Sequence, residues 1–157
     1  MDVRYSCSQR DFKRYTTDEI RREFLIENLF TPDVVNTVYT HIDRVVVIGC
    51  MPVNGSVPID KGMDVWASFG SNYFLERREA GVFNVGGSGS VYVDGKSFGM
   101  DNKDCLYITR GAREVVFESK NPDMPAKFYL VSVPAHRSYE TKLIRISDAA
   151  KKTYGFC

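Results

Sequence analysis

A run of four charged residues and two separate histidines are the side chains of this sequence that are best suited to binding or catalysis. The run reads Glu-Arg-Arg-Glu from Glu76 to Glu79. Arginine offers a carboxylate ligand a bidentate fork, so this run is a candidate anion site. Alternation along a strand puts Arg77 and Arg78 on opposite faces, and at most one of them points inward. The other interpretation is a charged strand edge that pairs across a sheet and discourages aggregation.

The histidines, His41 and His136, are far apart in the sequence. Two imidazoles alone do not make a zinc site, which needs three or four N, S or O ligands. We expect His41 to be a hydrogen-bonded strand residue at the surface, whereas a functional and a structural role stay equally open for His136, in a loop. The glycine-rich stretch 86–89 is followed by another strand pattern, so a phosphate-binding loop is not expected.

Strand patterns surround these residues. Phe83, Val85, Val91 and Val93 alternate on both sides of the glycine-rich stretch 86–89, which predicts two strands that face a core and are joined by a flexible reversal. Asp94-Gly95 then predicts a tight type I′ turn, because both residue types tolerate positive φ.

The remaining chain divides into three parts. A helix is predicted to begin at Thr17, whose side chain can cap it, with Ile20 and Phe24 on one face. Short β-rich runs with turn signals between them predict an all-β sandwich or small barrel. We expect an arm with a short helix over residues 1–30, a barrel over 31–134, and a connector over 135–157.

Composition excludes several classes of protein. The 157 residues fit one domain, and 21 basic against 20 acidic residues give no basic stripe for nucleic acid. No apolar run is long enough for a membrane helix and no leader peptide is visible, so a soluble, cytoplasmic protein is expected. Its cysteines, Cys7, Cys50, Cys105 and Cys157, form no CxxC pair. They fit reduced thiols, with Cys50 and Cys105 as small buried hydrophobic residues.

Several of these stretches together resemble one family. They are Tyr39 to Arg44, Tyr73 to Glu79, Gly81 to Gly87, Gly111 to Phe117, Pro125 to Tyr129, Pro134 to His136 and the opening Met1 to Arg4. Their sequences closely resemble the 5-keto-4-deoxyuronate isomerases, also called 4-deoxy-L-threo-5-hexosulose-uronate ketol-isomerases. The resemblance covers nearly the whole chain.

The resemblance implies an all-β, cupin-type (jelly-roll) barrel from a two-cupin enzyme of pectin breakdown. That family is zinc-dependent and hexameric, and its substrate is a small 4-deoxyuronate. This chain resembles only the N-terminal half. The family's zinc ligands, three histidines and a glutamate, lie in the second cupin, so no metal or other cofactor is expected in this chain. Aligning the cupin motif puts the ligand positions on Tyr73, Leu75, Ala80 and Glu114, while Gly87 keeps the motif's glycine, which predicts an emptied metal site.

Ketol isomerisation needs a base for a C–H proton and an electrophile for the enolate oxygen. The candidate catalytic bases here are His41, Glu114 and His136, and the candidate substrate-binding residues are Arg44, Tyr73, Arg77 and Arg78. We expect an N-terminal half that builds the oligomer and supports the catalytic half. The alternatives are a stand-alone, metal-free module that binds an acidic sugar through its arginines, and an independent enzyme of altered chemistry.

Overall fold

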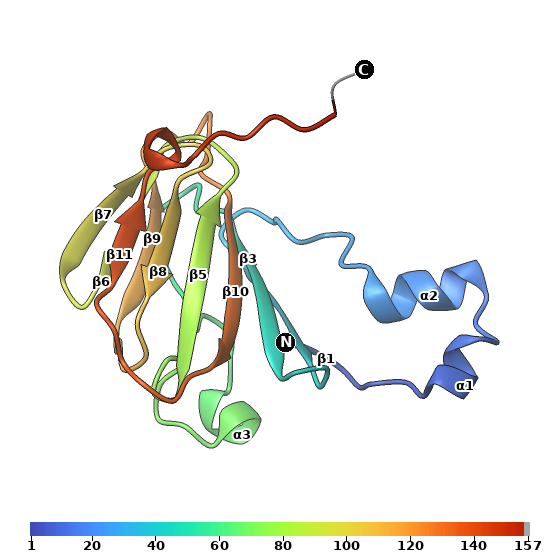
Figure 1. Ribbon diagram of the computed structural model, residues 1–157. Helices are drawn as coiled ribbons and strands as arrows, with labels where there is room; N and C mark the ends of the chain where they lie inside the picture. The colour runs from blue at the N-terminus through green and yellow to red at the C-terminus, as the bar shows by residue number, and fades with distance from the viewer. Residues whose placement is uncertain (156–157) are drawn as a thin grey trace.

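Two β-sheets packed face to face form the body of the protein in a computed structural model that describes residues 1–155 (Figure 1). The larger sheet contains, in spatial order, β1 (Asp2–Arg4), β2 (Val35–Thr40), β3 (Val45–Cys50), β10 (Phe128–Pro134), β5 (Arg78–Asn84), β8 (Cys105–Ile108) and β11 (Lys142–Ile144). The smaller sheet contains β4 (Val57–Pro58), β9 (Val115–Ser119), β6 (Gly89–Val93) and β7 (Lys96–Met100). Their pairings are antiparallel except for β1 with β2.

The core lies between the two sheets and follows from strand alternation. Leu130 of β10 and Val82 of β5 pair directly, and both side chains point inward and are fully buried. Phe117 of the smaller sheet meets Phe128 of the larger one, with ring centroids 5.1 Å apart. Each such side chain contributes about 1.5 to 3 kcal/mol when it leaves water. The all-β, cupin-type fold is therefore confirmed.

The glycine-rich stretch differs from the prediction in two ways. Val91 and Val93 face the core, but Phe83 is 43% exposed and Val85 is 50% exposed, so the predicted inward positions of β5 are wrong by one residue. The hydrophobic pattern of β5 misleads because both of its faces carry apolar residues, and a shift of one residue exchanges the faces. The stretch 86–89 is also a crossing from the larger sheet to the smaller one rather than a hairpin, since β5 and β6 do not pair.

Glycine is required in that crossing by a close backbone approach. A Cβ atom on Gly87 would lie 2.0 Å from the carbonyl oxygen of Met124. The following turn at Asp94-Gly95 has φ values of +47° and +81° and joins β6 to β7, which confirms the predicted tight reversal.

The N-terminal arm leaves the barrel beside β2 (Figure 1). It carries α1 (Gln9–Phe12) and α2 (Thr17–Phe24), and neither helix has a buried residue. The helix cap is Thr16, not Thr17 as predicted, because Thr16 and Glu19 form a reciprocal capping box. Within the predicted arm, β1 adds a short parallel strand that the sequence pattern did not reveal. None of the helices described over residues 1–155 is long and apolar enough to cross a membrane.

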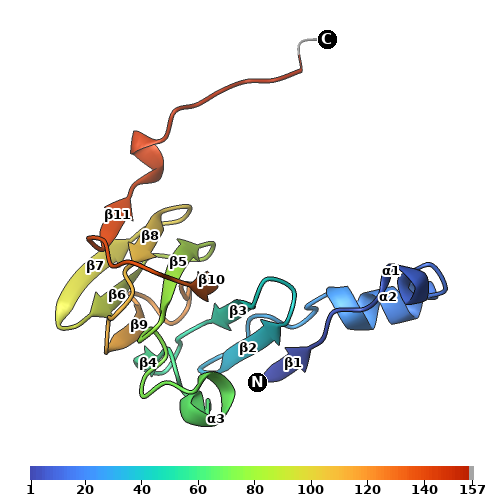
Figure 2. The same cartoon turned by 60° about the horizontal axis from the view of Figure 1, so that its bottom comes forward.

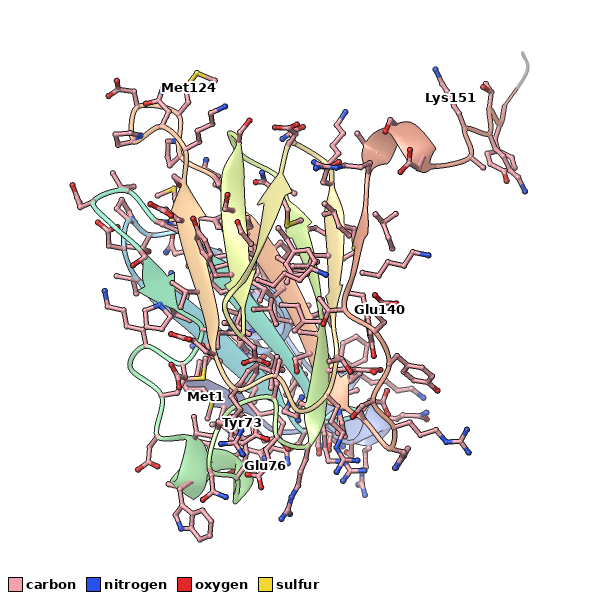
Figure 3. All side chains as sticks on the ribbon, turned by 90° about the vertical axis from the view of Figure 1, so that its left-hand side faces the viewer. Met1, Tyr73, Glu76, Met124, Glu140 and Lys151 are labelled. Atoms are coloured by element: carbon pink, nitrogen blue, oxygen red, sulfur yellow. The ribbon has the colours of Figure 1, made fainter. Side chains whose placement is uncertain are left out.

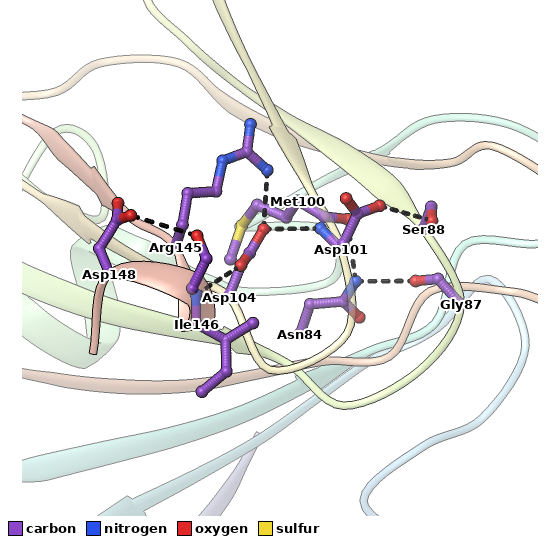
Figure 4. Close-up of polar contacts among 10 residues, drawn as sticks. Asn84, Gly87, Ser88, Met100, Asp101, Asp104, Arg145, Ile146 and Asp148 are labelled. Atoms are coloured by element: carbon purple, nitrogen blue, oxygen red, sulfur yellow. Dashed lines mark hydrogen bonds and ion pairs between the residues drawn. The ribbon is translucent and has the colours of Figure 1, made fainter. Parts of the chain in front are cut away.

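A third helix, α3 (Val65–Phe69), marks one end of the barrel, and we call this end the α3 end. The opposite end, which we call the Asp104 end, holds a buried carboxylate (Figure 4). Asp104 accepts hydrogen bonds from the backbone N–H groups of Asp101 and Ile146, each at 2.9 Å, and from Arg145 Nη1 at 2.7 Å. These contacts fasten β11 and a short 3₁₀ helix (Ile146–Asp148), within the stretch predicted as a connector, to the barrel.

Three cysteines, Cys7, Cys50 and Cys105, are free thiols. Cys50 is fully buried in the core, as predicted, whereas Cys105 is only half-buried. Burial raises the pKa of the Cys50 thiol to about 12. Cys157 lies outside the described residues.

Candidate functional site

Strand direction gathers the candidate residues at the α3 end. Arg44 immediately precedes β3, Arg78 opens β5, and His136 follows the end of β10. Because β10 is antiparallel to both β3 and β5, its last residues lie beside the first residues of those strands. Figure 3 places Tyr73 and Glu76 at this end of the barrel and Met124 at the other.

Arg78 is the buried charge at the α3 end. Its inward position on β5 leaves only 6% of the residue exposed. Its Nη2 atom donates to the carbonyl oxygens of Arg44 at 2.7 Å and Ser132 at 2.8 Å, and its Nε atom donates to Ser132 Oγ at 3.2 Å. Its guanidinium also lies over the ring of Phe69, 5.3 Å from the centroid. These contacts fix the guanidinium but give it no counter-charge.

The environment of Arg78 opposes its charge. Loss of hydration, followed by the repulsion of Arg44, lowers the pKa of Arg78 to about 10, although Tyr39 acts in the opposite direction. The side chain therefore remains a cation at neutral pH. A buried cation without an anionic neighbour costs free energy that a bound anion would offset.

Two further arginines, Arg110 and Arg113, lie in the loops of the α3 end. Arg110 donates from Nε to the carbonyl oxygen of Glu76 at 3.2 Å and from Nη1 to that of His136 at 3.1 Å. Arg113 lies over the ring of Tyr73, with its Cζ atom 5.5 Å from the centroid. The ion pairs found among residues 1–155 are all elsewhere, in the arm and at the Asp104 end.

Nearby carboxylates are already engaged by uncharged donors. Asp94 accepts from the backbone N–H groups of Arg113 and Glu114, each at 2.9 Å. Glu76 accepts from the backbone N–H of Asn72, and Glu79 accepts from the hydroxyl of Tyr107 at 2.7 Å. The arginines of the α3 end therefore keep hydrogen-bonding capacity for an external anion.

A small cavity of about 220 Å³ opens beside Arg113, and Arg78 is not among its lining residues. Arg113 and Glu114 line it together with Phe74, Leu75 and Asp60. Typical small-molecule pockets measure roughly 300 to 1,000 Å³, so this cavity is smaller than a typical ligand site.

The three predicted bases share the α3 end but do not converge. His41 is exposed, and its ring stacks on Tyr5 with the centroids 4.5 Å apart. Glu114 and His136 are exposed as well. Within residues 1–155 no side-chain hydrogen bond or ring contact joins these three residues to one another, and Arg77 is likewise exposed.

The aligned metal positions do not fit zinc. Leu75 and Ala80 are each 1% exposed and belong to the hydrophobic core, where their side chains offer no ligand atom. Tyr73 packs under Arg113, and Glu114 faces solvent. The described part of the chain contains no group of three or more His, Cys, Asp or Glu residues placed to hold a metal ion.

Sequence reasoning missed Arg110, Arg113 and Asp104. The sequence Arg-Gly-Ala-Arg over residues 110–113 has the pattern of a turn, and two arginines in a turn directly after a strand are a usable signal of a binding site. Asp104 gave no such signal, because its partner Arg145 is 41 residues away in the sequence.

Comparison with known proteins agrees with the resemblance. Residues 37–156 match the model of the KduI/IolB family. A 4-deoxy-L-threo-5-hexosulose-uronate ketol-isomerase of Halalkalibacterium halodurans is 45% identical over 99% of this chain and 55% of its own length. The protein of the same name from Lachnospira eligens is 48% identical over 92% of this chain and 50% of its own. The chain thus spans about half the length of the curated relatives it matches.

Solved structures are more distant. A cupin protein from Bacteroides fragilis aligns over 82% of this chain and 100% of its own, with 16% identity and a TM-score of 0.43. A putative glyoxylate-induced protein from Pseudomonas aeruginosa covers 66% of this chain and 35% of its own, with 17% identity and a TM-score of 0.48. The family match extends over well more than half of the sequence, and the chain therefore belongs to the KduI/IolB family.

Proposed function

We propose that this chain is the N-terminal cupin half of a 4-deoxy-L-threo-5-hexosulose-uronate ketol-isomerase and is inactive alone. The observation that carries the proposal is the 45% identity along 99% of this chain with a relative of that name, of which the chain covers only 55%. In this proposal the substrate is a 4-deoxyuronate, the complete enzyme is a cytoplasmic homo-oligomer, hexameric as the family resemblance implies, and the zinc site belongs to the other half.

The arginines of the α3 end favour an auxiliary role for this chain in binding the uronate. A uronate carries a carboxylate, and Arg78 is a preorganised cation without a counter-ion within residues 1–155. Isomerisation also needs a base to move a proton between neighbouring carbons. Glu114, which lines the 220 Å³ cavity, is better placed for this than His41, which is stacked on Tyr5.

Complementation tests the proposal directly. The chain is expressed alone, together with the remaining half of the Halalkalibacterium halodurans relative, and that half is also expressed by itself. Isomerisation of the 4-deoxyuronate is followed by proton NMR. We expect turnover only from the combination. Turnover by the chain alone, or no gain over the other half alone, would contradict the proposal.

A second candidate function, a metal-free module that binds an acidic sugar, is favoured by the unpaired Arg78. Calorimetry of the isolated chain with galacturonate tests it. Saturable binding that is lost in Arg78→Met and kept in Arg77→Met supports this candidate, because Arg77 is exposed and matches Arg78 in charge. No heat at millimolar ligand removes it.

A further inference from the structure

A second pocket opens at the α3 end, on the outer side of the larger sheet, and we call it the outer pocket. Its volume of about 340 Å³ lies within the roughly 300 to 1,000 Å³ of typical small-molecule sites. Arg78 does not line it. The lining residues come from β5, from the end of β10 and from the connection that follows β10: Glu79, Pro134, Ala135, His136, Arg137 and Tyr139.

Strand alternation places a carboxylate in the outer pocket. Arg78 points into the barrel, so its neighbour Glu79 points outward. Tyr107 of β8 lies opposite Gly81, two residues further along β5, and donates its hydroxyl to Glu79 Oε2 at 2.7 Å. The other carboxylate oxygen, Oε1, accepts no hydrogen bond from residues 1–155. The carboxylate is therefore held in place while one of its oxygens stays available to a ligand.

The wall opposite Glu79 is the connection between β10 and β11, and its backbone is fixed. Figure 2 shows this connection running from β10 past β5 and β8 to β11, in agreement with the strand order. Arg110 Nη1 donates to the carbonyl oxygens of Ala135 at 3.2 Å and His136 at 3.1 Å. The backbone N–H of Tyr139 donates to Thr109 Oγ1 at 2.9 Å. A wall that is already ordered lowers the entropic cost of binding.

The side chains of the outer pocket suit a sugar ring. Glu79 is planar and accepts hydrogen bonds from hydroxyl groups, while Arg137 and His136 can donate to hydroxyl oxygens. Tyr139 is 63% exposed, so its ring offers a flat apolar surface. A pyranose has hydroxyl groups around its rim and C–H groups on its faces. Polar groups beside one accessible aromatic ring match both of these features.

The charges of the outer pocket favour a neutral ligand. Glu79 and Arg137 carry opposite charges, and both line the same 340 Å³. An anion would be repelled by Glu79, and a cation would be repelled by Arg137. The surroundings of Arg78 differ, because that guanidinium has no counter-ion among residues 1–155. The two places therefore select ligands of different charge.

We infer that the outer pocket binds a neutral pyranose, with its hydroxyl groups on Glu79 and Arg137 and one face of the ring on Tyr139. Arg110 acts as a positioning residue, since it holds the wall that carries His136. This site is additional to the acidic-sugar site proposed around Arg78. The α3 end thus offers one place for a carboxylate and another for an uncharged sugar ring.

Saturation-transfer NMR of the full chain tests the inference with the methyl glycosides of galactose, glucose and xylose, each at up to about 50 mM. We expect at least one of them to bind with a dissociation constant of about 1 to 10 mM. Tyr139→Ala should weaken this binding at least about 10-fold, because the aromatic surface is lost. The matched control is Tyr154→Ala, at a tyrosine that is 81% exposed and outside the pocket, which should bind like the wild type.

Glu79→Gln provides a second variant, since its amide oxygen can still accept from Tyr107 but has lost the charge that strengthens a hydrogen bond. We expect at least about 5-fold weaker binding. Circular dichroism checks that each variant is folded. Absence of saturation transfer from all three glycosides at 50 mM would overturn the inference, and so would unchanged binding in folded Tyr139→Ala and Glu79→Gln. The glycosides carry no carboxylate and no turnover is measured, so the outcome is separate from that of the isomerase proposal.

Discussion

Each end of the barrel buries one charged side chain, and the two charges have very different surroundings. Asp104 is 1% exposed and accepts two backbone N–H groups and the guanidinium of Arg145. Arg78 is 6% exposed and meets only carbonyl oxygens, a hydroxyl and an aromatic ring. At the Asp104 end the buried charge has a counter-ion, Arg145, whereas the α3 end holds a buried charge without a counter-ion among residues 1–155. This contrast indicates a structural role for Asp104, and it is the basis on which we propose Arg78 for ligand binding.

The pKa values of the two groups express the same difference. Burial alone would raise the pKa of Asp104, but the hydrogen bonds from Ile146, Asp101 and Arg145 outweigh burial and lower it. For Arg78, loss of hydration is the main influence and lowers the pKa to about 10. The protein stabilises the charged form of the aspartate and disfavours the charged form of the arginine.

The largest effect on stability is expected from Asp104→Ala. The substitution removes the acceptor of two backbone N–H groups and the partner of Arg145, at about 1 kcal/mol each, so the free energy of unfolding should fall by about 3 kcal/mol. Urea denaturation measures it. Asp101→Ala is the control, because the side chain of this exposed neighbour accepts one hydrogen bond, from Ser88, and its loss should cost less than about 1 kcal/mol. Equal losses in the two variants would remove the structural role of Asp104.

Arg78→Met is expected to affect binding more than stability. It removes a buried charge and its desolvation cost but leaves acceptors at Arg44 and Ser132 without a donor, so stability should stay within about 1 kcal/mol of the wild type. Affinity for galacturonate should fall about 30-fold or more, the equivalent of about 2 kcal/mol.

Calorimetry measures the affinity, and Arg78→Lys serves as the companion variant, since it keeps the charge but loses the fork. If Arg78→Met destabilised the fold by about 3 kcal/mol and bound the sugar normally, Arg78 would have a structural role like that of Asp104, and the proposed ligand-binding role would be wrong.

Arg145→Ala gives a smaller change. The Arg145 side chain is 42% exposed, so water replaces much of its interaction with Asp104, and the backbone donors of Asp104 remain. We expect a loss of about 1 kcal/mol in the free energy of unfolding, measured in urea. A loss as large as that of Asp104→Ala would show that the ion pair, rather than the backbone contacts, fastens the C-terminal segment.

Between about pH 5 and 8 neither buried charge should change stability, because both keep their ionisation there. The folded-state pKa of Asp104 is lowered, so its contribution is complete above the unfolded pKa of about 4 and is lost as pH falls through the folded value. Thermal unfolding at pH 2 to 5 should therefore show an acid-dependent loss that is smaller in Asp104→Asn. An unchanged acid dependence in that variant would assign the loss to other carboxylates.

The fold was predictable where local chemistry decides it. The turn at Asp94-Gly95 requires only positive φ values, and it was predictable because Asp and Gly both tolerate them. The direction of Phe83 was not predictable, because apolar residues on both faces of β5 remove the alternation that distinguishes inside from outside.

The candidate site was predictable in part. Alternation implied that at most one of Arg77 and Arg78 points inward, but only the pairing of β5 with β10 identifies Arg78 as the buried one. The structural role of Asp104 depends on its contact with Arg145, which is 41 residues away in the sequence, and no local pattern predicts such a contact.

Cys50 makes the unfolding of this barrel measurable by chemistry. Its buried thiol has a pKa of about 12, so almost no thiolate is present to react with an alkylating reagent while the sheets are closed. Cys7 lies in the arm outside the core and reacts without opening the barrel. The ratio of the two labelling rates, followed by mass spectrometry of the digested chain, therefore gives the fraction of molecules that open the core in a given time. The two native cysteines therefore report the rate at which the core opens.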